Sequence, residues 1–167
     1  MAHTAGMVTF NCSSNVVFDF ILDGGNNLLW RPSVTDVAPL AEEPYGVGSI
    51  FKQGVNGPGG RIDGDYKITE CKLNRLIKFT VTAGPIRYTG TYKFTPNGNS
   101  TTVTFVLVFQ VRGIFKLVEP MINESMESEV NALSDLKTYL EEHFPFRQDI
   151  NDGSGKLLEL QEMKVSM

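Results

Sequence analysis

An apolar strand that runs into one long amphipathic helix constrains this chain most. Residues 101–112 (TTVTFVLVFQVR) alternate between a face of large apolar side chains and a face with threonines, valines and Gln110. After the break at Gly113, residues 117–142 carry an apolar stripe at helical spacing. The stripe consists of Val118, Ile122, Met126, Val130, Leu133, Leu136 and Leu140. This order predicts a curved antiparallel sheet closed over one long helix, which can enclose a cavity.

Length and charge narrow the classes of protein to consider. The 167 residues suit one domain with a short extension. The net charge of -4 comes without a cluster of Lys and Arg, so we expect no nucleic-acid partner. No apolar run reaches the roughly 18 residues that a membrane span needs, so we expect no stable membrane insertion. The start of the chain, MAHTAGMVTF, lacks the pattern of a signal peptide. These features predict a cytoplasmic protein.

The cysteines and histidines form no metal-binding or catalytic pattern. Cys12 and Cys71 lack the spacing of metal ligands, and we expect reduced, partly buried thiols. His3 and His143 lie near the ends of the predicted domain, where His143 suits the C-terminal end of a helix. The inward strand positions carry almost no charge, and we expect no charged set in the interior. The sequence therefore predicts no metal site and no cofactor.

Period-two alternation and turn residues predict an α+β domain. Short turns join most strands, which favours an antiparallel meander with one face covered. Gly64 falls on the apolar face of its strand and is expected at a bend or bulge. The expected strands are 6–11, 33–39, 46–55, 61–71, 75–83, 86–94 and 101–112, and the expected helices are 15–22, 26–30 and 117–142.

The end of the chain differs in composition from the rest. We expect residues 1–144 to form one domain and residues 145–167 to form a tail with a short helix as one option. Residues 147–156 are polar, whereas residues 157–164 (LLELQEMK) can form two helical turns. A flexible tail and a helix that docks on a second copy or on the domain both remain open. A homodimer is therefore one alternative for the oligomeric state.

Six segments carry a family resemblance. They are 17–32 (VFDFILDGGNNLLWRP), 45–52 (YGVGSIFK), 64–70 (GDYKITE), 74–80 (NRLIKFT), 88–105 (YTGTYKFTPNGNSTTVTF) and 133–142 (LSDLKTYLEE). In this order they resemble the START-like superfamily, also called SRPBCC, and most of all its polyketide cyclase/dehydrase branch. The resemblance implies a helix-grip fold, in which a curved antiparallel sheet of about six to seven strands wraps around the long C-terminal helix. Two short helices follow the first strand.

The resemblance also implies a deep cavity between the sheet and the C-terminal helix. The residues expected to line it are Trp30, Phe51, Tyr66, Phe79, Tyr88, Tyr92, Phe105, Leu107, Phe109, Ile122, Met126 and Val130. The same aromatic residues at strand alternation also suit a filled core. Gly90, between Tyr88 and Tyr92, removes a side chain where a ligand could fit. The Gly-rich stretch 54–60 suits either a hairpin at the cavity entrance or a tight turn.

Three function classes follow from these features. Members of the superfamily bind lipids, hormones, polyketides and other apolar ligands, so binding or transport of a lipid, quinone or polyketide-like molecule leads. The alternative is a cyclase, aromatase or dehydratase on a polyketide-like substrate, which predicts a buried polar pair that faces an open cavity, such as a Tyr with Gln53 or Ser49. A further alternative is a protein-interaction or regulatory module. The sequence assigns no catalytic residue, and whether the chain is an enzyme stays open.

Overall fold

The computed structural model describes residues 2–57, 59–111 and 113–145. Within these residues eight strands form one curled antiparallel sheet in the order β1-β8-β7-β6-β5-β3-β2, with β4 paired to β3. The strands are β1 (Ala2–Phe10), β2 (Val34–Pro39), β3 (Ile50–Gly57), β4 (Gly60–Asp63), β5 (Tyr66–Lys72), β6 (Leu76–Val81), β7 (Tyr88–Asn97) and β8 (Ser100–Phe109). The α+β helix-grip prediction is confirmed.

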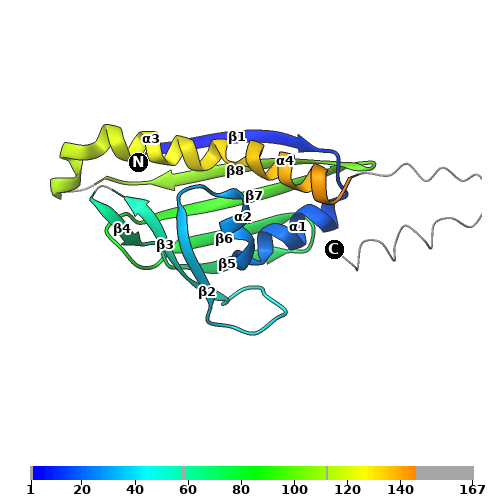
Figure 1. Cartoon of the computed structure of the whole chain (residues 1–167), viewed down its shortest axis with the longest axis horizontal. Coiled ribbons are helices and arrows are strands. Elements are labelled where there is room, and N and C mark those ends of the chain that lie inside the picture. Colours follow the sequence, from blue (N-terminus) through cyan, green and yellow to red (C-terminus); the bar gives the residue numbers. More distant parts are fainter. Residues whose placement is uncertain (1, 58, 112, 146–167) are drawn as a thin grey trace, which may run out of the picture.

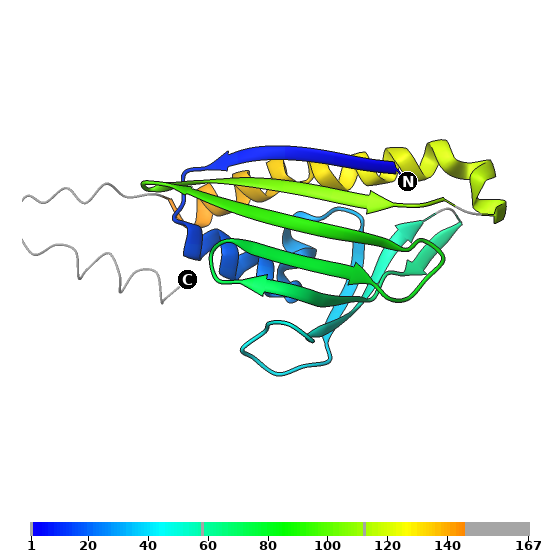
Figure 2. The ribbon, with the colours of Figure 1, turned by 180° about the vertical axis from the view of Figure 1, so that it is seen from behind.

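The helices cover one face of this sheet. They are α1 (Ser14–Leu22), the short 3-10 turn η1 (Gly24–Asn26), α2 (Asn27–Trp30), the 3-10 turn η2 (Gly113–Val118), α3 (Glu119–Asn131) and α4 (Leu133–His143). Figure 1 shows α3 and α4 as one long bent helix that runs along the sheet. Figure 2 shows that the opposite face of the sheet carries no helix. The core therefore lies between the inner face of the sheet and these helices.

The C-terminal helix differs from the single helix predicted over residues 117–142. Its first turn, η2, is a 3-10 turn that begins at Gly113, and the helix bends at Ala132. The backbone N–H of Ala132 still donates to the Ser128 carbonyl at 3.0 Å, and the Leu136 N–H donates to the Ala132 carbonyl at 3.0 Å, so helical hydrogen bonds continue through the bend. The predicted apolar stripe is nonetheless correct, because its members from Ile122 to Leu140 are buried. The bend lets both halves of the helix follow the curled sheet.

The expected strand over residues 61–71 is two strands. The structure divides it at Gly64, where the Gly64 N–H donates to the Gln53 carbonyl. The Gln53 N–H in turn donates to the Asp65 carboxylate at 3.0 Å. A side chain thus replaces strand pairing at this point. As a result β4 pairs with one end of β3 and β5 with the other, which gives eight strands instead of six or seven.

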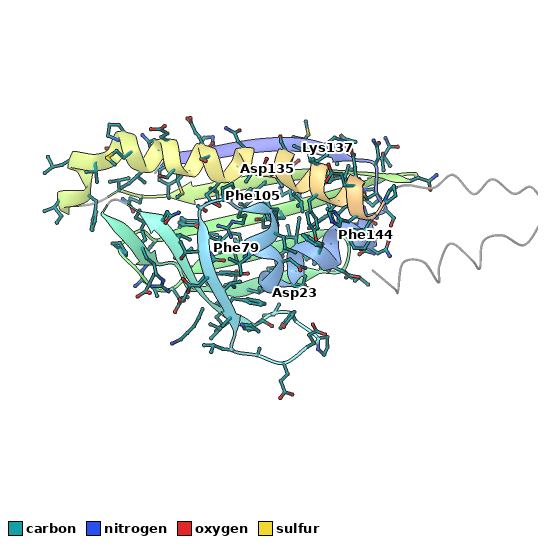
Figure 3. The ribbon with its side chains drawn as sticks, viewed as in Figure 1. Asp23, Phe79, Phe105, Asp135, Lys137 and Phe144 are labelled. Carbon is teal, nitrogen blue, oxygen red and sulfur yellow. The ribbon has the colours of Figure 1, made fainter. Side chains whose placement is uncertain are left out.

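Alternation in the strands sorts residues as predicted. In β8 the large side chains from Val103 to Phe109 that point inward are all at most 4% exposed, while Val108 on the other face is 36% exposed. Phe79 from β6 and Phe105 from β8 belong to the same interior (Figure 3). The ring of Phe105 stacks on Tyr92 with centroids 4.0 Å apart. Aromatic packing of this kind fills the middle of the domain.

Two glycines let backbones come close in this core. A Cβ at Gly24 would lie 2.1 Å from the Tyr66 hydroxyl and 2.6 Å from the Phe51 ring. A Cβ at Gly6 would lie 2.4 Å from Cγ1 of Val130. Gly24 therefore lets η1 sit on the aromatic core, and Gly6 lets α3 pack directly on β1.

Cys12 and Cys71 are free thiols, as expected. No described helix is both long and apolar enough to cross a membrane. The predicted tail falls almost wholly on residues 146–167, which lie outside the described residues, so the domain boundary near residue 144 stays a prediction.

Candidate functional site

An open cavity of about 390 Å³ lies between α3 and the β3–β4 hairpin. Figure 1 shows this hairpin and α3 at the same end of the molecule. The apolar wall of the cavity is formed by Val55, Ile62, Val81, Ile86, Met121, Ile122 and Met126. The polar and small residues of the wall are Ser33, Asn56, Gly57, Asp63, Gly64, Tyr88, Glu124, Ser125, Ser128 and Glu129. The cavity combines a mostly apolar surface with a few polar groups, as small-molecule sites do.

A buried ion pair borders this cavity. Nε and Nη2 of Arg31, which follows α2, lie 2.8 Å and 2.7 Å from Oε2 of Glu129 on α3. The two side chains are only 4% and 8% exposed. Ser33 donates its hydroxyl proton to the other Glu129 oxygen. The loop after α2 is thereby tied to the long helix, and Glu129 and Ser33 both reach the cavity wall.

Burial and nearby charges shift the pKa values of Arg31 and Tyr88. Burial is the largest single influence on the pKa of Arg31 and lowers it, but the Glu129 carboxylate together with Tyr88, Tyr92 and Tyr66 raises it, and the net pKa lies above its usual value. Burial also raises the pKa of Tyr88, while the Arg31 charge opposes this rise. At neutral pH Arg31 is therefore charged, and Tyr88 is a neutral phenol that can donate or accept a hydrogen bond.

The expectation of an uncharged interior is wrong at this pair. The inward strand positions are indeed almost free of charge, but Arg31 comes from a loop and Glu129 from the helix. A sequence signal for Glu129 existed, because it lies three residues after Met126 and one before Val130 of the apolar stripe. No local signal marks Arg31 as its partner.

A second polar group lies deeper in the domain. The Asn27 amide donates to Oε1 of Gln53 at 2.9 Å and to the Tyr66 hydroxyl at 3.2 Å. Asn27, Tyr66 and Arg31 border a void of about 20 Å³. Burial raises the pKa of Tyr66 to about 12. The cyclase alternative predicted a Tyr with Gln53 facing an open cavity, but Tyr66 and Gln53 are not among the residues that line the 390 Å³ cavity. Sequence reasoning missed Asn27, which bridges the two.

The residues predicted to line one cavity do not share one space in the structure. Tyr88, Ile122 and Met126 line the 390 Å³ cavity, and Phe109 and Ile122 line a neighbouring groove of about 600 Å³. Three others border the 20 Å³ void: Tyr66, Phe79 and Tyr92. The remaining five lie in the packed core and are not among the residues that line these spaces: Trp30, Phe51, Phe105, Leu107 and Val130.

The β3–β4 hairpin contributes residues that sequence reasoning did not assign. Val55, Asn56 and Gly57 come from it, within the Gly-rich stretch 54–60 that suited an entrance hairpin. Ser49, the other expected polar residue, accepts a hydrogen bond from the Gly46 N–H at 2.9 Å and so stabilises a turn. The Gly-rich composition of residues 54–60 was the sequence feature that indicated a cavity wall at this hairpin.

The space expected at Gly90 is filled. A Cβ at this position would lie 2.2 Å from Cζ of Phe79 and 3.1 Å from Cδ2 of Leu107. The missing side chain therefore makes room for the Phe79 ring and not for a ligand. Gly90 is not among the residues that line the 390 Å³ cavity between α3 and the β3–β4 hairpin.

A second groove, of about 510 Å³, lies at the other end of the helices. Asp23 and Phe144, both labelled in Figure 3, line it together with Phe20 and Tyr45.

No group of three or more His, Cys, Asp or Glu side chains that could hold a metal ion occurs among residues 2–57, 59–111 and 113–145.

Comparison with known proteins relates this architecture to one family. A family model described as polyketide cyclase / dehydrase and lipid transport matches residues 1–141. A search of curated proteins finds no match to the chain.

Solved structures share the fold at low sequence identity. TTHA0849 from Thermus thermophilus superimposes with a TM-score of 0.72 at 18% identity, covering 86% of this chain and 99% of that one. A START superfamily protein from Mycobacterium smegmatis gives 0.65 at 16% identity, over 83% and 98% of the two chains. The Zhui aromatase/cyclase from Streptomyces gives 0.65 at 14% identity, over 83% and 94%. These likenesses support the fold.

Proposed function

The chain belongs to the polyketide cyclase/dehydrase and lipid transport family of START-like proteins, and on this premise we propose that it binds an apolar small molecule in the 390 Å³ cavity. The cavity itself is the observation that carries the proposal. Its volume falls in the range of roughly 300–1,000 Å³ that is usual for small-molecule sites. Lipids, quinones and polyketide-like molecules have the apolar bodies that such a wall would desolvate.

The apolar wall supplies the favourable free energy of binding. Val55, Ile62 and Val81 come from the sheet, and Ile122 and Met126 face them from α3. Burying apolar ligand surface against them contributes about 25 cal/mol per Å². Met126 and Met121 add flexible thioether side chains that adapt to ligands of different shape. Tyr88 and Glu129 then orient the polar end of the ligand.

Native mass spectrometry of the purified protein tests this proposal. We expect a bound small molecule that is released on denaturation and named by its mass. Ser125 is exposed and lines the cavity, so Ser125→Trp should fill the space and abolish ligand retention. Ser134 is exposed on α4 and does not line the cavity, so Ser134→Trp is the matched control. Equal ligand retention in both variants would contradict binding in this cavity.

An enzyme of cyclase or dehydratase type is the second candidate. The observation in its favour is that the neutral Tyr88 phenol and the Glu129 carboxylate both reach the wall of the cavity. A phenol and a carboxylate are groups that move protons in such reactions. A dehydratase would convert the ligand to a product lighter by one water, whereas a cyclase that stops at addition would form an isomer of equal mass that separates on chromatography. Tyr88→Phe should then retain binding and lose this conversion, whereas a ligand unchanged in both mass and chromatographic retention after incubation with the wild type contradicts the enzyme.

A further inference from the structure

The charge around the 390 Å³ cavity restricts the ligand that it can hold. Three carboxylates lie in its wall, those of Asp63, Glu124 and Glu129, whereas none of its described lining residues is Lys, Arg or His. Resting on the proposed function, we propose that the ligand is a neutral or cationic amphiphile, such as an alcohol, phenol or amine with an apolar body. An anionic amphiphile of the fatty-acid type should bind more weakly.

Arg31 and Arg61, the cationic side chains beside the cavity, already form ion pairs with carboxylates of the protein. Arg31 is buried and pairs with Glu129 through two nitrogens. Arg61 makes two bonds to the Asp36 carboxylate, at 2.7 Å and 2.9 Å, and a third to Asp63 at 2.9 Å. Arg31 thus balances Glu129, while two carboxylates share the single charge of Arg61. No cation remains for a ligand carboxylate at either place.

Arg87 lines the neighbouring groove and is not among the residues that line this cavity. Its Nε donates to the Gly84 carbonyl at 2.8 Å, and its Nη1 donates to the Thr82 carbonyl. Glu124 makes no ion pair within the described part of the chain. It is exposed at the cavity wall, so its carboxylate is the accessible charge.

The polar groups of the wall also suit a donor on the ligand. The carboxylates of Glu124, Asp63 and Glu129 accept hydrogen bonds and cannot donate them when ionised. An ammonium or hydroxyl group could donate to them, and a charge-assisted bond of this type is about twice as strong as a neutral one. A carboxylate in the same place would meet like charges beside an apolar wall, where attraction and repulsion are stronger than in water.

Three ten-carbon probes that differ only in the head group test this inference. Decylamine, decan-1-ol and decanoate should be titrated separately into the full chain by calorimetry at pH 7. We expect the amine to bind about tenfold more tightly than the carboxylate, with the alcohol between them. Equal or tighter binding of decanoate would overturn the inference and leave the proposed function intact. Binding of none of the three would count against both.

Two charge reversals on α3 separate the local charge from the net charge of the protein. Glu124→Lys should remove or invert the preference for the amine, because Glu124 lines the cavity. Glu127 is exposed on the same helix but does not line the cavity, so Glu127→Lys makes the same change in net charge and should keep the preference. The same shift in both variants, or amine binding that persists in Ser125→Trp, would refute recognition in the cavity.

Discussion

Gly90 on β7 lies directly opposite Phe79 on β6, and the Phe79 ring covers the Gly90 backbone so closely that a Cβ would lie 2.2 Å from Cζ. From strand alternation alone, the missing side chain at Gly90 was expected to leave room for a ligand. The structure fills it from the neighbouring strand, and Leu107 closes it from the other side. The contact therefore belongs to the packing of the sheet.

Gly90→Ala should destabilise the protein by about 1–3 kcal/mol, because the new methyl group would displace the Phe79 ring in a filled core. Urea unfolding followed by circular dichroism measures this. Gly46→Ala is the matched control, since nothing lies within 4 Å of a Cβ there. Adding Phe79→Leu to Gly90→Ala should recover part of the loss. Equal stability of the Gly90 and Gly46 variants would show that the ring moves aside freely.

The buried ion pair should be sensitive to removal of one partner. Glu129→Gln should destabilise the domain by about 3–5 kcal/mol, because it leaves the Arg31 charge buried without a counter-ion. The double variant Arg31→Met with Glu129→Leu should be more stable than Glu129→Gln, since it removes both charges. Glu70→Gln breaks the exposed pair with Lys72 and should change stability by less than about 1 kcal/mol. A similarly small effect at Glu129 would mean that Arg31 reaches solvent.

Stability should fall as the pH rises from about 10 to about 12. The pKa of Tyr66 is raised from 10.0 to about 12, chiefly by burial, so the unfolded chain loses the phenol proton before the folded one does. The unfolded state then binds fewer protons, and the free energy of unfolding decreases with pH in this window. Urea unfolding at pH 9, 10 and 11 measures the slope, which Tyr66→Phe should reduce. A flat profile across this window would contradict a buried neutral phenol.

The two thiols should react at different rates. Burial raises the pKa of both cysteines, so neither is an activated thiolate. Cys12 is buried and Cys71 is partly exposed. A colorimetric thiol reagent should therefore modify Cys71 first and Cys12 only as the domain opens, and Cys71→Ser should remove the faster phase. Simultaneous modification of both would show that the region of Cys12 opens as readily as the β5 surface.

Much of the fold was predictable from the sequence because it depends on local patterns. Alternation places Val103, Phe105 and Leu107 on one face of β8 whatever the rest of the chain does. Helical spacing does the same for the stripe on α3 and α4. Gly64 was the one sequence feature that suggested the split between β4 and β5, because the split depends on two hydrogen bonds with Gln53 in another strand. The Gly64 N–H donates to the Gln53 carbonyl, and the Gln53 N–H donates to the Asp65 carboxylate.

The candidate site was predictable only in part. Tyr88, Ile122 and Met126 do line the open cavity, since each faces inward near its edge. Phe105 and Val130 face inward as well, yet they lie in packed core, because facing inward does not specify whether a neighbour fills the space. An entrance hairpin at residues 54–60 was one of two alternatives, but Val55 and Asn56 were not predicted as lining residues, because the pattern of the hairpin does not say what lies opposite it.

The sequence by itself determined which face of each strand and helix is apolar, because that depends on side chains a few positions apart. Only the tertiary structure decided where those faces leave room and which polar groups meet. Arg31 and Glu129 are 98 positions apart, and only the wrapping of the sheet around the helix brings them together. Cavity volume and ion pairing depend on the distances between packed elements, and a one-dimensional pattern does not contain those distances.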